Sequence, residues 1–348
     1  MIKEQHFAQA LEKGVLSIEQ VAALKALAVQ YPDDDDLMAQ PVASADEENF
    51  RFLTSFNDIF VTIGIALFLG ALTYIVRAPM KEYLAPFSNL FVVVASWFLA
   101  RYFTLKKRMA LPSIVLLLIF TGFTFWLLTD IFSFLKMSSN VANLFSAFFT
   151  SIATYMHWRT FRVPITVASG AATLITIVWS LAVIIFGPKV ETIIKPFIFI
   201  SGLITFGIAM RFDAQDTLRQ TRYTDIAFWL HLLAAPMIVH PLVIDMVSSG
   251  KELSFISSCL ILGLFTLLGL IALLVDRRAI LVSSLSYAGY ALAVLIGSSG
   301  FKQDFVFPAT IFVLGAAILL LSAGWTPLRA KVLRHAPAQW KLYLPQAL

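Results

Sequence analysis

The chain has 348 residues, of which 59% are hydrophobic and only 14% are charged, and its mean hydropathy is +0.82. Soluble proteins average about 45–50% apolar and about 25% charged residues, so this composition excludes a soluble globular protein and predicts a chain embedded in the lipid bilayer. The net charge of +5 is scattered over short connections without a basic face, which argues against a nucleic-acid partner.

The polar residues 1–31 predict a small cytoplasmic helical hairpin. Gly14 is placed to end a first helix, Ser17 and Gln20 match a reciprocal capping box at the start of a second, and Pro32 ends that helix. Residues 32–52 then predict an acidic flexible linker. Its four aspartates at 33–36 lack the glycine turn and ligand ladder of a calcium loop, which favours a solvated linker over a cation site.

About ten apolar runs follow, each long enough to cross roughly 30 Å of hydrocarbon as a helix. An all-α, polytopic membrane helix bundle is therefore expected, in which the first apolar run directs insertion because no cleavable signal peptide precedes it. The predicted spans are 56–76, 84–104, 111–132, 139–157, 164–186, 192–210, 224–247, 254–275, 279–297 and 305–323.

Lys and Arg residues are concentrated in alternate connections, which sets the expected orientation. The richer side carries Arg101, Lys106, Lys107, Arg108, Arg159, Arg162, Arg211, Arg219, Arg222, Arg277, Arg278, Arg329, Lys331, Arg334 and Lys341. This side is expected to face the cytoplasm, which places both termini there. The expected location is the inner membrane of a bacterium.

Two short sequence matches recur at a constant offset and predict a parallel duplication of a four-helix unit. TSFNDI at 54–59 matches TRYTDI at 221–226, and WRTFR at 158–162 matches WTPLR at 325–329. Residues 53–162 would form the first membrane repeat, 163–216 two connector helices, 217–329 the second repeat and 330–348 a cytoplasmic tail.

The matched motifs also supply candidate ion pairs. Asp58 and Asp225 are expected in the first turn of their helices, where a carboxylate meets the positive end of the helix dipole. Arg162 and Arg329 are expected at helix ends on the same face, so they are candidate partners of the two aspartates. Independent helix caps and headgroup anchors are the simpler alternative.

The span 224–247 has the most unusual composition of the ten, because it contains His231, His240 and Asp245 together with two prolines. Pro236 and Pro241 predict breaks that free backbone carbonyls inside the membrane. The histidines either satisfy such carbonyls in a kinked helix or, with Asp245, Asp225 and Asp58, line a solute or proton pathway.

Other chemistry has little support in the sequence. The two histidines lie on opposite faces of a straight helix, and the single cysteine, Cys259, excludes a cysteine cluster, so we expect neither a metal site nor a cofactor. No catalytic motif occurs, and an enzymatic role is not expected. Asp213, Asp216 and Asp225 alternate with Arg219 and Arg222, which favours an ion-paired loop over a lipid-active centre.

The segment LEKGVLSIEQ, the acidic linker and the stretches FNDIFVTIG, FWLHLLAAPMIVHP and GWTPLR resemble a family of multi-pass bacterial membrane proteins that contains a domain of unknown function. The resemblance implies a cytoplasmic hairpin before a many-helix membrane domain, and it supplies no site residues.

Three functions are therefore considered. The first is a transporter-like or solute-binding bundle that uses the broken helix 224–247. The second is a non-catalytic scaffold or regulatory protein that recruits a cytoplasmic partner through residues 1–31, and the third is a membrane-embedded enzyme. The sequence also leaves self-association open.

Overall fold

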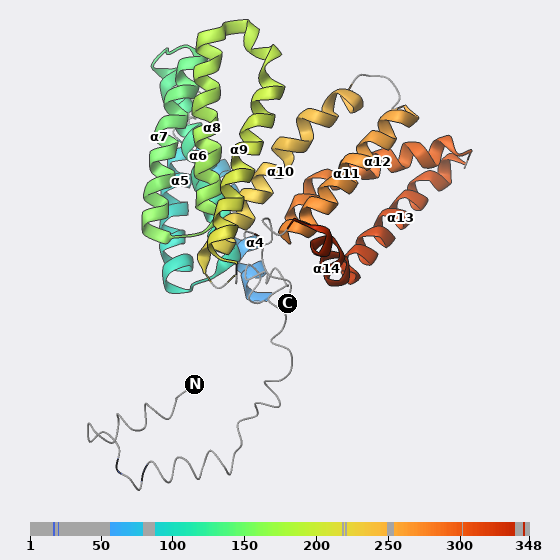
Figure 1. Ribbon diagram of the computed structural model, residues 1–348. Coiled ribbons are helices and arrows are strands. Elements are labelled where there is room, and N and C mark those ends of the chain that lie inside the picture. Colours follow the sequence, from blue (N-terminus) through green and yellow to red (C-terminus); the bar gives the residue numbers. More distant parts are fainter. Residues whose placement is uncertain are drawn as a thin grey trace. The chain divides into compact units, whose positions relative to one another are not determined.

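The computed structural model describes Ser17, Gln20 and residues 56–78, 88–217, 219, 221–248, 254–300, 302–337 and 344. The chain divides into two compact units, residues 1–47 with Leu348 and residues 48–347, and the helices labelled in Figure 1 belong to the second unit. These helices are α4 (Phe56–Arg77), α5 (Ser88–Ala100) with its π-helical extension η2 (Arg101–Lys106), α6 (Ala110–Phe134), α7 (Ser139–Phe161), α8 (Ile165–Phe186) with the 3-10 turn η3 (Gly187–Thr192), α9 (Ile194–Gln215), α10 (Arg222–Ser248), α11 (Phe255–Val275), α12 (Ala279–Ser298), α13 (Gln303–Ala323) and α14 (Trp325–His335).

The prediction of an all-α, multi-pass membrane protein is confirmed. Each predicted span corresponds to one helix, and among the described residues eight helices are long and apolar enough to cross a membrane. The eight are α4, α5 with η2, α6, α8 with η3, α9, α10, α11 and α13. The predicted total of about ten exceeds this number, because α7 is not among the eight and α12 supplies only the shorter apolar stretch Ser284–Ser298.

Helix α7 owes its polar composition to its buried face. Ser146, Thr150, Thr154 and His157 lie on that face, and each is at most 1% exposed. The opposite face exposes large apolar side chains, including Phe148 and Ile152. A helix that buries polar groups and exposes apolar ones is stable when its surroundings are lipid, so its mean hydropathy understates its fit to a membrane.

Helices adjacent in sequence pack as neighbours through most of the second unit. Helices α4 to α8 form one such series, and α9 and α10 form an extensive antiparallel pair (Figure 1). Helix α10 also packs against α8 on one side and α12 on the other. It therefore joins the first series to α11, α12, α13 and α14, which pack among themselves.

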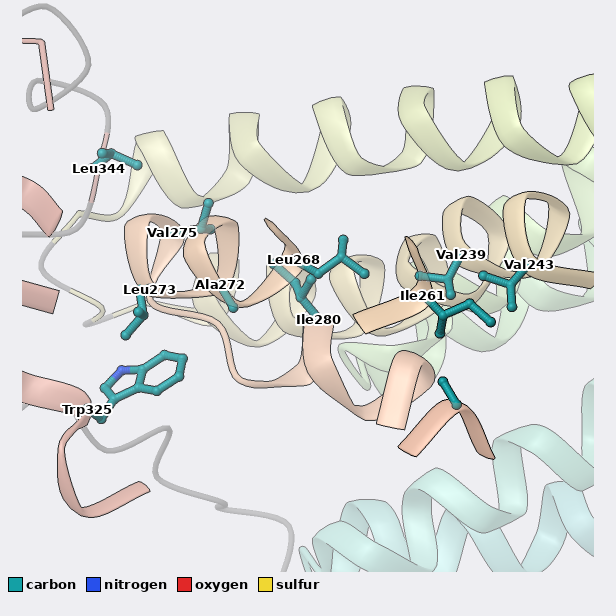
Figure 2. Close-up of a cluster of buried hydrophobic side chains, with 11 residues drawn as sticks. Val239, Val243, Ile261, Leu268, Ala272, Leu273, Val275, Ile280, Trp325 and Leu344 are labelled. Atoms are coloured by element: carbon teal, nitrogen blue, oxygen red, sulfur yellow. The ribbon is translucent and has the colours of Figure 1, made fainter. Parts of the chain in front are cut away.

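The buried apolar side chains follow this arrangement. In Figure 2, Val239 and Val243 of α10 lie near Ile261 of α11, while Trp325 lies near Leu273 at the opposite end of the cluster. A second cluster joins α4, α5 and α6 to the α7–α8 connection. Trp229 of α10 packs against this second cluster and also against a third one around Ala209 and Leu230. The first turns of α10 therefore connect separate parts of the core.

Gly202 allows α9 and α10 to approach closely. A Cβ atom at this position would lie 2.9 Å from the Met237 Cβ and from the Ile238 Cγ1 of α10. Small residues serve this purpose in membrane helices, where association depends on close packing rather than on expulsion of water.

Two further predictions are tested only in part. The reciprocal capping box is confirmed, because the Ser17 amide donates to Gln20 Oε1 at 2.9 Å and the Gln20 amide donates to Ser17 Oγ at 3.2 Å. The rest of the predicted hairpin and the linker 32–52 lie outside the described residues. The duplication is not shown, and its second motif differs between the copies: Trp158 lies in the last turns of α7, whereas Trp325 begins the separate helix α14.

We predict that Gly202→Ala destabilises the protein by about 1–3 kcal/mol, because the added methyl group meets both backbone and side-chain atoms of α10. Gly207→Ala in the same helix is the matched control, since nothing lies within 4 Å of a Cβ built there. Thermal unfolding in detergent measures both variants. Equal melting temperatures for the two would show that Gly202 does not set the spacing of α9 and α10.

Candidate functional site

His231 lies in a buried cluster of charged residues rather than in an open cavity. Its Nε2 atom is 2.8 Å from Asp213 Oδ2, and the imidazole is fully buried. Arg277 binds the other oxygen of the same carboxylate, and its Nη2 also donates to the Thr224 carbonyl at 3.2 Å. Asp213 therefore connects the end of α9, the middle of α10 and the start of the α11–α12 turn.

A second carboxylate, Asp276, extends the cluster. The Arg219 Nη1 lies 2.9 Å from Asp276 Oδ2, and the Trp325 indole Nε1 donates to Asp276 Oδ1 at 2.7 Å. The Arg329 Nε lies 3.6 Å from the same Oδ1 atom. This second group therefore attaches the α9–α10 connection and helix α14 to the α11–α12 turn.

Local backbone structure explains how the turn presents these charges. Asp276 ends α11 in the left-handed conformation with φ 58°, which reverses the chain within a few residues. Burial lowers the pKa of the Arg219 guanidinium, and the charge of Arg277 lowers it further, whereas Asp276 and Asp213 raise it. The ordinary pKa of arginine is so far above neutrality that the group stays charged.

The start of α10 is capped by Asp216. Its Oδ2 atom accepts hydrogen bonds from the Thr221 amide at 2.8 Å, the Thr221 hydroxyl at 2.7 Å and the Thr224 hydroxyl at 2.9 Å. A carboxylate at this place satisfies free amide groups and also meets the positive end of the helix dipole. These contacts are hydrogen bonds from uncharged groups. The ion pairs of this region join Asp213 to Arg277 and Arg219 to Asp276, so both partners come from the α11–α12 turn.

The remaining candidates in α10 lie apart from His231. His240 is exposed, and its Nδ1 contacts the Tyr287 hydroxyl. Asp245 is exposed and pairs with Lys195. Helix α10 continues through Pro236 and Pro241, so the predicted breaks do not interrupt its helical course. A proline removes one hydrogen bond, and the bonds on either side of it maintain the helix.

The two motif aspartates lie in the first turns of their helices, Asp58 in α4 and Asp225 in α10. Asp58 is 2% exposed. Arg329 pairs with Asp276, a residue that the sequence had not suggested as its partner. Arg162 ends α7 and lines the same pocket as Asp225. The proposed pairing of Asp58 and Asp225 with Arg162 and Arg329 stays a prediction.

This pocket has a volume of about 560 Å3. It lies between η2, the start of α6, the α7–α8 connection and the first turns of α10. Arg108, Arg162, Arg222 and Asp225 supply its charges, so three cations face one carboxylate. Its apolar wall includes Leu105, Met109, Ile114, Phe161, Val163 and Trp229. The pocket is therefore amphipathic, with a net positive lining.

No family model, no curated protein and no solved structure matches the chain. The functional argument therefore depends on the residues themselves. Among the described residues, no three histidine, cysteine, aspartate or glutamate side chains converge as a metal ion would require.

Sequence reasoning missed several residues that the structure brings together. Asp276 was not singled out, Arg277 was counted only among the basic residues that set the orientation, and the bond from Trp325 was not foreseen. A detectable signal existed, because consecutive charges in a turn too short to reach far into water must find partners within the protein. The identity of those partners depends on which helices pack together, so the local sequence does not predict it.

We predict that Asp213→Asn destabilises the protein by about 3–5 kcal/mol, because it leaves Arg277 buried without its carboxylate partner. Asp245→Asn is the control, and removing this exposed partner of Lys195 should cost at most about 1 kcal/mol. Melting temperatures of the purified proteins compare the two. A similar small shift for both would mean that the buried cluster does not hold the helices together.

Proposed function

We propose that this integral multi-pass membrane protein is a transporter-like, solute-binding bundle whose ligand is an amphiphilic anion. The pocket between η2, α6, the α7–α8 connection and α10 is the binding site. Its net positive lining supports this proposal, since arginine is suited to carboxylate and phosphate groups. Helix α10, for which the sequence left a structural kink and a functional element as alternatives, contributes through Arg222, Asp225 and Trp229 rather than through its histidines.

The backbone at two of the arginines gives further support. Arg108 and Arg162 adopt left-handed conformations, with φ values of 54° and 53°. This conformation costs a non-glycine residue roughly 1–2 kcal/mol, and glycine would adopt it freely. Both positions carry an arginine despite this cost, and both side chains line the pocket. We infer that these guanidinium groups serve binding.

The apolar wall specifies the rest of the ligand. Phe161, Val163 and Met109 are buried, and Trp229 adds a partly buried indole. A purely polar anion would leave this surface without a partner. A ligand with an anionic head and a short apolar chain uses both parts of the pocket, and each buried methylene contributes about 0.8 kcal/mol.

The Lys and Arg distribution supports a cytoplasmic position for the pocket, because Arg108, Arg162 and Arg222 belong to the richer side. We accordingly place the protein in a bacterial inner membrane with both termini in the cytoplasm. The inverted polarity of α7, together with the apolar stretch of α12, supports ten crossings rather than eight.

The test is a titration of the full-length protein in nanodiscs of uncharged phosphatidylcholine. Hexyl phosphate should bind more tightly than inorganic phosphate, and the double variant Arg108→Gln/Arg162→Gln should weaken hexyl phosphate binding at least tenfold. Arg159→Gln is the matched control, because this exposed arginine contacts Tyr155 and does not line the pocket.

Two sources of the ligand are separated by a second set of nanodiscs that contain phosphatidylglycerol. Competition by this lipid for the hexyl phosphate site would identify a membrane lipid as the ligand, and unchanged binding would identify a soluble amphiphile. Equal affinity of the double variant and the Arg159→Gln control would contradict the proposal. Attention would then return to residues 1–31 and the scaffold hypothesis.

A further inference from the structure

The buried faces of α6 and α7 carry polar side chains that form a row along the two helices. Ser146, Thr150, Thr154 and His157 recur every three or four residues on α7, over about 16 Å of helix. Thr121 and Thr124 lie on the buried face of α6. We call these six residues the polar seam.

Two ring contacts determine how the helices lie against each other. Phe120 contacts His157 with 5.4 Å between ring centroids, and Phe132 contacts Phe145 at 5.9 Å. Phe120 and Phe132 are twelve residues apart on α6, and their partners His157 and Phe145 are twelve residues apart on α7 in the opposite direction. The two helices are therefore antiparallel and in register over this length. This antiparallel alignment places Thr124 at the level between Thr150 and Thr154.

Several seam groups have no hydrogen-bond partner. The hydroxyls of Thr121, Thr124 and Thr150 are buried without one, and so are both ring nitrogens of His157. Three of the six threonines in α6 and α7 instead donate to the backbone carbonyl four residues earlier: Thr129 to Phe125, Thr154 to Thr150 and Thr160 to Met156. An unpaired buried polar group costs about 1–3 kcal/mol, so this many in one row calls for an occupant such as water.

His157 lies at one end of the seam, next to the pocket. It is 1% exposed and is surrounded by the rings of Trp97, Phe120 and Phe161. The Phe161 ring, 4.4 Å from the imidazole, also lines the pocket. One aromatic ring therefore lies between His157 and the basic end of the helices.

Asp130 lies at the other end of the seam. The alignment of α6 and α7 places it beside Ser146, and its Oδ2 accepts a hydrogen bond from Asn89 at 3.0 Å. The neighbouring Ser88 hydroxyl is buried without a partner. Asp130 is partly exposed and therefore joins the seam to the far surface.

We propose that the polar seam is a hydrated proton path across the membrane, with His157 and Asp130 at its two ends. Successive groups on α7 are about 4.5–6 Å apart along the helix, a gap that one water bridges with two hydrogen bonds. At His157 a proton binds one ring nitrogen while the other nitrogen releases its proton, so the imidazole leaves the step neutral. This proposal does not depend on anion binding in the pocket.

Proton flux in proteoliposomes that contain the full-length protein tests the path. A potassium gradient with valinomycin supplies the membrane potential that drives protons across the bilayer. A pH-sensitive dye trapped inside the vesicles reports the proton flux. His157→Phe should reduce the flux at least tenfold. Its melting temperature should hold or rise, because an aromatic ring fits the surrounding rings and removes unpaired nitrogens.

Thr150→Val and Thr160→Val form a second, matched pair on the same helix. Thr150 is buried and unpaired, whereas Thr160 is exposed and donates to the Met156 carbonyl. The first substitution should reduce the flux severalfold and the second should leave it unchanged. Vesicles that acidify no faster than protein-free vesicles, or equal flux in all variants, would overturn the proposal. A loss of anion binding with intact flux would overturn only the proposed function.

Discussion

The buried carboxylate of Asp213 needs a hydrogen-bonding or charged partner at each of its two oxygens. This requirement sets the arrangement of the helices in the second half of the membrane domain. In a bundle surrounded by lipid this group cannot turn to water, so its charge must be met by His231 and Arg277. These partners come from different helices, and α9, α10 and the α11–α12 turn therefore meet in one arrangement. Asp276 adds α14 by the same means. Such buried pairs define an arrangement more than they add stability.

Buried polar groups are paired around Asp213, whereas several of those between α6 and α7 have no partner. Around Asp213 the charges are mutually paired, which favours a rigid framework. Between α6 and α7 the groups are uncharged and several are unpaired, which favours exchangeable water. Helix α10 connects the two regions: the Thr224 carbonyl receives Arg277, and Asp225 in the next position lines the pocket. The rigid cluster therefore positions one wall of the pocket.

The sequence was sufficient to predict the helices because most of the apolar runs are long enough to cross a membrane. It predicted α4 to α13. A hydropathy criterion alone nevertheless leaves α7 out of the membrane spans, because its threonines lower the mean hydropathy although they face the interior of the bundle. Side-chain partners were much harder to predict. The Ser17–Gln20 capping box is local and was predicted correctly, whereas the bond from His231 to Asp213 and the bond from Trp325 to Asp276 depend on which helices pack together.

Phe161 relates the two proposals physically, because its ring lines the pocket and also contacts His157. An anion seated in the pocket lies on the far side of this ring from the imidazole. Under the two proposals, an anion in the pocket and a proton in the polar seam are separated by this ring, and opposite charges so placed attract each other. Binding coupling is reciprocal, so each would favour the other. The two proposals taken together therefore predict coupled binding of an anion and a proton.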